Sequence, residues 1–528
     1  MKGVATGAAA LALVLLTFFQ FPGHTYLQQD SQIYVPILEH LRDASVLRNE
    51  ILAQQPHVAF TLYDEAARFL RGASGLGFRE VLAFEQVVTR ALGIWGLYLM
   101  ATALGLSTLP AALVATLASL GSTIVGPEVL TFEYEPTPRA FAVPLLICGM
   151  GLAAHRQYLA AGIAGAVAFL YHAPTAVPFW AVFVALLALR RKPWGLAPLA
   201  TAALVLTAAA WSQSGSGEAQ AFFSRLTPSQ EHLQRIRAAY VWISTWPGGR
   251  ILHYGILSGI LLAAFARIRR VVPVDLGVFL MGLPALGLLS MPLSWLLLER
   301  WKWALIPQFQ PLRALLFVAL SLQFLTAVAG AYAVKRRRPF EAFGWFAVAY
   351  LLPFRAVTAE PFPLRRAGVV LALAAVTAFA AGISWRLAPA VAVAAFFAIP
   401  IVGGVVNYPR LHTPELAQLS QWARTSTPQD AVFLFPDASH ALYPGVFRSE
   451  ALRAVYVDWK GGGQVNYLKD FAEQWWFRWQ LTMADGFKPA DLPKYGGLGI
   501  AYVVLQPQNR LPLPAVFENA KYVAYSVR

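Results

Sequence analysis

The sequence predicts a polytopic α-helical membrane protein with about 11 to 13 transmembrane helices, followed by a small α/β domain outside the membrane. Three observations support this class. Of the 528 residues, 57% are hydrophobic and 13% are charged, which is about half the charged fraction of soluble domains. Apolar runs long enough to cross a bilayer recur up to residue 406, and the composition then becomes polar. An ordinary soluble enzyme and a disordered chain are therefore excluded.

Thirteen apolar runs in residues 1–406 are candidates for membrane-spanning helices, because about 20 apolar residues cross a bilayer as a helix. The first run ends in aromatic residues rather than in the small residues of a cleavage site, so we expect an uncleaved anchor. The candidate spans are residues 3–21, 83–103, 110–126, 138–154, 157–171, 174–190, 194–212, 252–268, 274–297, 313–334, 340–354, 367–385 and 387–406.

The distribution of basic residues predicts the orientation of these spans. With the N-terminus in the cytosol, the cytosolic turns carry 13 Lys and Arg residues and no acid, although Asp275 and Glu341 stand close by. An odd number of spans then places three polar segments outside the cytosol: residues 22–82, 213–251 and 407–528. The predicted cytosolic turns and the tail together account for the net charge of +15. The positive charge therefore reflects the orientation of the spans, and we expect no nucleic-acid partner.

The tail, residues 407–528, has the pattern of a small α/β domain. A helix-like segment at 414–423 is followed by short β-like runs with helical stretches between them. These runs are residues 431–435, 454–457, 500–505 and 522–527. About 120 residues are enough to bury a core of their own. Gly461–Gly463 follow Lys460 without the spacing of a Walker motif, so we expect a flexible turn there.

Asp30 comes shortly after the first span, which places it near the outer bilayer surface. Ile33, Ile37, Leu38 and Leu41 follow it at helical spacing, and this predicts an amphipathic helix along the membrane interface. The Asp30 carboxylate is then either an N-cap, because Asp accepts backbone N–H bonds at helix starts, or a functional group.

The second outer loop contains Glu133, Glu135 and Arg139. Two prolines favour extended backbone, in which residues two apart face the same way. Glu133 and Glu135 are therefore expected to present two carboxylates on one side, either to hold a divalent cation or to divide acid and base roles. The alternative is a solvated loop in which Glu135 pairs with Arg139.

Further polar residues stand at the same side of the membrane. His172 lies between two apolar runs, either as a hydrogen-bonded interface residue or as a functional group. The late loop carries Arg300, Lys302 and Arg313 beside Trp and Gln residues. Arg binds phosphate through a planar bidentate fork, and Arg313 heads the next span at headgroup depth; interfacial anchoring is the alternative. For the middle loop we expect a solvated helix.

This layout resembles the GT-C-type membrane glycosyltransferases, in which the first span leads into a large outer loop with an acidic residue near its start. The resemblance implies a bacterial enzyme of the inner (cytoplasmic) membrane. It would transfer a hexosyl or pentosyl group, with inversion, from a polyprenyl-phosphate carrier to an extracytoplasmic glycan, lipid or protein acceptor. The implied roles are catalysis by Asp30, acceptor binding by Glu133, Glu135, Arg139 and His172, and lipid-phosphate binding by Arg313, Arg300 and Lys302. The resemblance implies no certain cofactor, but a divalent cation at Glu133 and Glu135 remains open as one.

Two other functions remain open from the sequence. A transporter would place charges near the bilayer midplane in repeated halves, whereas the polar groups here gather at outer ends and no repeat is visible. A non-catalytic protein could bind envelope polymers through its tail. Removing the tail separates these cases, because such a scaffold would lose its partner whereas an enzyme would retain some transfer in the bundle.

Overall fold

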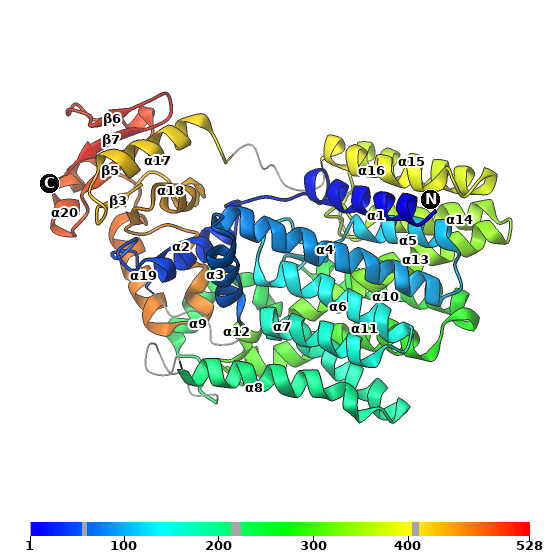
Figure 1. The fold of residues 1–528 in the computed structure, drawn as a ribbon. Coiled ribbons are helices and arrows are strands. Elements are labelled where there is room, and N and C mark those ends of the chain that lie inside the picture. Colours follow the sequence, from blue (N-terminus) through cyan, green and yellow to red (C-terminus); the bar gives the residue numbers. More distant parts are fainter. Residues whose placement is uncertain (1, 55–60, 213–222, 404–410, 528) are drawn as a thin grey trace.

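The computed structural model describes residues 2–54, 61–212, 223–403 and 411–527. Figure 1 shows a bundle of helices with a cap of shorter helices and a sheet packed at one end. The cap combines the first loop, the middle loop and the tail. The bundle contains α1 (Lys2–Phe19), α4 (Phe78–Ala103), α5 (Thr108–Ser119), α6 (Pro138–Ala154), α7 (Tyr158–Arg190), α8 (Ala197–Ser212), α10 (Gly248–Ile268), α11 (Val274–Ser294), α13 (Leu316–Lys335), α14 (Pro339–Leu351), α15 (Leu364–Ile383) and α16 (Ala388–Val402).

Six helical segments in the described ranges are long and apolar enough to cross a membrane. They are Tyr158–Arg190, Pro193–Trp211, Gly248–Val271, Val274–Arg300, Ile306–Lys335 and Leu364–Ile383. Shorter apolar helices, among them α5, α6 and α16, pack with these segments. The predicted class of polytopic α-helical membrane protein is confirmed.

Helix α7 is a hairpin of two arms that turn at His172, whose backbone leaves the helical region (φ −157°, ψ 85°). The indole N–H of Trp180 donates to the carbonyl of Gly165 at 3.1 Å. In a straight helix these residues would lie about 22 Å apart, so the arms must run antiparallel. The two separate helices predicted at 157–171 and 174–190 are thus present, and that each crosses the membrane stays a prediction.

The span predicted at 110–126 is wrong in its second half. Helix α5 ends at Ser119, and the chain returns through a short hairpin of β1 (Thr123–Ile124) and β2 (Val129–Leu130). Gly121 and Gly126 have positive φ values of 76° and 93°, which glycine adopts without strain. The apolar residues of this stretch are buried against other helices, and hydropathy alone does not distinguish burial in protein from burial in lipid.

The basic turns gather at the end of the bundle opposite the cap and carry their own acidic partners. The carboxylate of Asp275 pairs with Arg190 at 2.7 Å and with Arg156 at 3.8 Å. Glu341 likewise pairs with Arg267 and, at 3.4 Å, with Arg338. Asp275 and Glu341 thus belong to the predicted cytosolic turns. Through these ion pairs they connect four of the turns with one another.

The tail forms the predicted α/β unit. Its five-stranded sheet has the order β4-β3-β5-β7-β6, with β3 parallel to both β4 and β5 and the last two pairs antiparallel. Each of the four predicted β-like runs contains a strand, and β6 is additional. The cap elements are α2 (Ser31–Arg42), α3 (Tyr63–Ser74), α9 (Pro228–Arg237), α17 (Pro414–Ser426), β3 (Val432–Leu434), α18 (Tyr443–Ala451), β4 (Ala454–Val455), α19 (Lys469–Thr482), α20 (Leu492–Gly497), β5 (Tyr502–Leu505), β6 (Phe517–Glu518) and β7 (Val523–Ser526). The predicted boundary at 406/407 lies outside the described residues.

The tail shares its hydrophobic core with the first loop, rather than burying a separate one as the sequence suggested. Residues of α2 and α3 belong to the same buried cluster as the sheet. Arg448, which is fully buried, donates to Asp458 at 2.7 Å and to the carbonyl of Gln32 at 3.2 Å. Glu50 of the first loop lies 3.7 Å from Arg448 and accepts the amide of Val455. This buried network fixes the tail on α2.

Candidate active site

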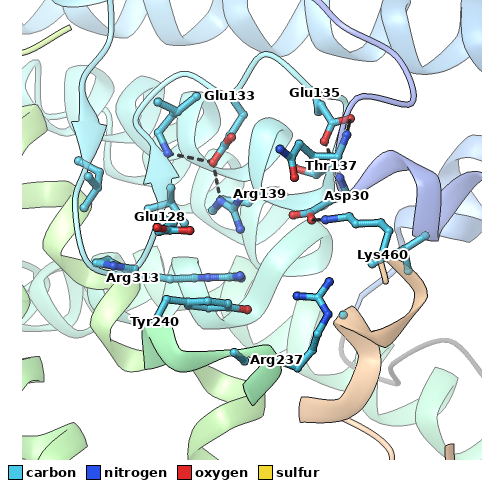
Figure 2. A pocket seen from close by; sticks show the side chains of 18 of the residues that line it. Asp30, Glu128, Glu133, Glu135, Thr137, Arg139, Arg237, Tyr240, Arg313 and Lys460 are labelled. Atoms are coloured by element: carbon cyan, nitrogen blue, oxygen red, sulfur yellow. Dashed lines mark hydrogen bonds and ion pairs between the residues drawn. The ribbon is translucent and has the colours of Figure 1, made fainter. Parts of the chain in front are cut away.

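A cavity of about 1090 Å³ lies between the end of the bundle and the cap. The start of α2, the loop before α6, the end of α9 and the tail turn at 459–467 all contribute to its wall. Six Lys or Arg and four Asp or Glu line it. Figure 2 shows the charged side chains pointing into a common space.

Asp30 stands at the N-cap position of α2, but its side chain does not cap the helix. Its carboxylate accepts a bond from the ammonium of Lys460 at 2.6 Å. Burial raises the pKa of Asp30, but the charges of Lys460, Arg139 and Arg313 outweigh burial and hold it well below its usual range. Asp30 is therefore ionised at neutral pH and faces the cavity.

Glu135 holds the segment that leads into α2. Its carboxylate accepts the amides of Gln28, Gln29 and Asp30 at 2.9, 2.7 and 2.6 Å, and the hydroxyl of Ser31 at 2.5 Å. These three amides belong to residues before the first residue of α2, and the carboxylate gives each of them an acceptor. Glu135 thus anchors the segment that presents Asp30.

Glu133, rather than Glu135, is the partner of Arg139. The carboxylate of Glu133 accepts from Arg139 Nε at 2.8 Å and from the amide of Leu130 at 3.0 Å. Both acids are therefore engaged by separate donors, and they do not form an open pair of carboxylates. Among the described residues no group of three or more His, Cys, Asp or Glu side chains is arranged to hold a metal ion. This donor set does not fit a divalent cation, which was one of the two roles left open for the acidic pair.

Three guanidinium groups converge beside Asp30 (Figure 2). Arg139 lies in the first turn of α6, and Arg313 lies in the 3-10 segment that leads into α13. Arg237 ends α9, where its Nε donates to the carbonyl of Trp459 at 3.0 Å and its guanidinium stacks 4.8 Å from the Trp459 ring centroid. The Nε of Arg313 is buried without a hydrogen-bond partner. In the described part of the chain, neither Arg237 nor Arg313 has a carboxylate within salt-bridge distance.

The remaining predicted residues divide between the cavity and its surroundings. His172 lines the cavity, and its Nδ1 accepts the amide of Thr175 at 3.2 Å, so a neutral ring carries its proton on Nε2. Arg300 stacks over Trp295, and Lys302 pairs with Glu231 at 2.6 Å. The structure does not bring Arg300 and Lys302 to the cavity wall.

Comparison with known proteins places this geometry in a fold. Residues 414–481 match a family model described as a domain of unknown function (DUF6798). No curated protein matches the sequence. The apo crystal structure of ArnT from Cupriavidus metallidurans superposes with a TM-score of 0.50 at 13% identity, covering 100% of this chain and 98% of that chain. The chain has a GT-C fold.

Other solved GT-C structures are similar at lower TM-scores. The apo oligosaccharyltransferase of Archaeoglobus fulgidus has a TM-score of 0.42 at 14% identity and covers 95% of this chain and 69% of that chain. Arabinofuranosyltransferase AftD from Mycobacteria has a TM-score of 0.42 at 17% identity and covers 95% of this chain and 35% of that chain. Identities this low concern the fold, and the substrate has to be argued from the cavity.

The GT-C cavity also contains residues that sequence reasoning missed, chiefly Lys460 and Arg237. Lys460 precedes the glycine triplet, which is not the flexible turn we expected. The triplet begins a 3-10 helix, Gly461–Asn466, in which a Cβ on Gly462 would lie 2.4 Å from Trp475 and one on Gly463 would lie 2.9 Å from Ile33. These contacts bring the turn against α2. In the sequence, the glycine triplet was the one signal that could have pointed to Lys460, because consecutive glycines also mark places where two segments approach closely.

Proposed function

We propose that this chain is a membrane glycosyltransferase that moves a sugar from a polyprenyl-phosphate carrier to an acceptor hydroxyl outside the cytosol. The observation that carries the proposal is the common cavity. An ionised carboxylate, Asp30, and the guanidinium groups of Arg139, Arg237 and Arg313 face one space. A carboxylate accepts a proton from a hydroxyl, and a guanidinium fork binds phosphate. The proposed reaction requires both groups next to each other.

Arg313 would bind the phosphate of the donor. Its buried Nε without a partner supports this role, because buried donors are normally satisfied. Arg313 also leads directly into α13, so a phosphate held there would lie at the outer end of a membrane helix. The polyprenyl chain would then extend sideways into the bilayer, while the sugar would point toward Asp30.

Asp30 would act as the general base. It takes the proton of the acceptor hydroxyl as the oxygen attacks the anomeric carbon, and the bond from that carbon to the phosphate oxygen breaks. The phosphate leaves with the bonding electron pair, giving free polyprenyl phosphate and a glycoside of inverted configuration. Glu135 would hold Asp30 in place, and Arg139 with its partner Glu133 would line the acceptor side together with His172.

The proposed orientation places the cavity outside the cytosol and the N-terminus inside. The basic turns at the opposite end of the bundle support this, because Lys and Arg are enriched in cytosolic loops. A transporter is not favoured, because the described charged residues of the site gather at one end of the bundle rather than near its middle.

Asp30→Asn tests the proposal, because it keeps the size of the side chain and removes the base. The assay measures release of free polyprenyl phosphate from a panel of polyprenyl-phosphate hexoses and pentoses incubated with the purified protein and envelope extract. We expect release by the wild type and its loss in the variant, with a cooperative unfolding transition showing that the variant still folds. Asp43→Asn, at the far end of α2, is the matched control. Undiminished release by Asp30→Asn would overturn the proposal.

A further inference from the structure

The ion pair between Lys460 and Asp30 joins the tail to the first loop across the cavity wall. The backbone around Lys460 is fixed on both sides. Asp458 is locked to Arg448 and accepts the amide of Gly461 at 3.2 Å, and the carbonyl of Trp459 is held by Arg237. The Lys460 ammonium is joined to this backbone through four methylene groups, so rotations within the side chain would move it while the backbone stays in place.

The other acids that line the cavity also have partners, and two of them are held by backbone amides. Glu133 is held by Arg139 Nε and a backbone amide, Glu135 by three backbone amides, and Glu128 by Arg355 at 2.9 Å. Asp30 differs from Glu133 and Glu135, because the partner of its carboxylate is the ammonium of Lys460 and not a backbone amide. Its side chain is 39% exposed, against 9% for Lys460, so the carboxylate is open to the cavity from the other side.

A phosphate bound by the three arginines would be the second anion within reach of Lys460. An ammonium has three donors and no fixed fork, so it can move between two anions or face both. When the Lys460 ammonium turns toward the phosphate, it stabilises the ionised form of Asp30 less. The pKa of Asp30 would then rise, and the carboxylate would become a stronger base. Arg139, Arg313, Tyr34 and Tyr467 also face Asp30. The two arginines lower the pKa of Asp30 as Lys460 does, and a bound phosphate would offset their positive charge too.

We infer that Lys460 is a positioning residue for which Asp30 and the donor phosphate compete, so that arrival of the donor releases Asp30 to act on the acceptor. This inference rests on the proposed function and adds to it an order of binding, with donor before acceptor. It also assigns the tail a place in the reaction, because Lys460 belongs to the tail while Asp30 belongs to the first loop.

The competition has a signature in binding that requires no catalysis. The experiment measures the dissociation constant of a polyprenyl monophosphate for the full chain in nanodiscs. Lys460→Met should weaken binding by about tenfold, as expected for loss of one charge-assisted contact. Asp30→Asn removes the competing anion and should tighten binding by about threefold or more. In the double variant Asp30→Asn with Lys460→Met, the gain from Asp30→Asn should vanish.

The controls separate this signature from general effects of charge and folding. Asp485 and Lys488 form an exposed pair at 3.9 Å in the same domain, and Asp485→Asn and Lys488→Met should leave the dissociation constant unchanged. Lys460→Arg keeps the charge and should bind close to the wild type, even if Lys460→Met is less stable. Weaker or unchanged binding in Asp30→Asn, or a gain that persists with Lys460→Met, overturns the inference. A wild type that does not bind the lipid overturns the proposed function itself, and the inference with it.

Discussion

The carboxylate of Glu135 lies 2.6 Å from the backbone amide of Asp30, a residue 105 positions earlier in the chain. Through this bond and its three companions, the second outer loop holds the segment that leads into α2, and the Asp30 side chain faces the cavity. The candidate base is thus positioned by Glu135, whereas Arg139, the partner that the sequence suggested for Glu135, pairs with Glu133.

Replacing Glu135 should therefore damage both stability and transfer. Glu135→Ala leaves three backbone amides and a hydroxyl without their acceptor, and each buried unsatisfied donor costs ~1–3 kcal/mol. We expect at least ~2 kcal/mol of destabilisation and loss of sugar transfer, measured by thermal unfolding and by the release of polyprenyl phosphate. Glu473→Ala, on the exposed face of α19, serves as control. Normal transfer in Glu135→Ala would show that Asp30 does not depend on these bonds.

Arg313 and Arg300 were both candidates for phosphate binding, and the structure places Arg313, but not Arg300, at the cavity wall. Arg313→Lys keeps the charge but loses the bidentate fork. We expect the KM for the polyprenyl-phosphate donor to rise about tenfold, which corresponds to ~1.4 kcal/mol, with little change in kcat. Arg300→Lys should leave KM unchanged because Arg300 stacks on Trp295 outside the cavity. Equal effects of the two substitutions would point to a general role of interfacial charge instead.

The packing of Gly462 offers a test of how the tail is held. A Cβ at this position would lie 2.4 Å from Trp475, and overpacking of this kind costs ~1–3 kcal/mol. We expect Gly462→Ala to lower the unfolding temperature and to reduce transfer, because the turn that carries Lys460 would shift. Gly497→Ala is the matched control, since a Cβ there meets nothing within 4 Å. If both variants are equally stable, the close packing is not needed for docking of the tail.

The sequence was sufficient for features that depend on local pattern. Hydropathy predicted the membrane class, and helical spacing after Asp30 predicted that α2 is a helix, although it packs under the tail and not along the membrane interface. Pairings between distant segments were not accessible. Lys460 reaches Asp30 across 430 positions, and the choice between Glu133 and Glu135 as partner of Arg139 depends on the path of one loop. The stretch after Ser119 was misassigned because an apolar residue buried in protein has the same composition as one facing lipid.

The pairing of Asp30 with Lys460 also predicts how stability depends on pH. The pKa of Asp30 lies below its unfolded value of about 3.9, because Lys460, Arg139 and Arg313 outweigh the effect of burial. The pair therefore stabilises the fold fully above about pH 4, and this contribution falls as the pH drops toward the lower folded pKa. The difference in unfolding temperature between the wild type and Lys460→Met should be largest at neutral pH and should narrow below about pH 4. Lys488→Met, in an exposed pair, should show little difference from the wild type at either pH. A difference for Lys460→Met that stays constant on acidification would mean that Lys460 stabilises the cap by packing alone and not through the Asp30 carboxylate.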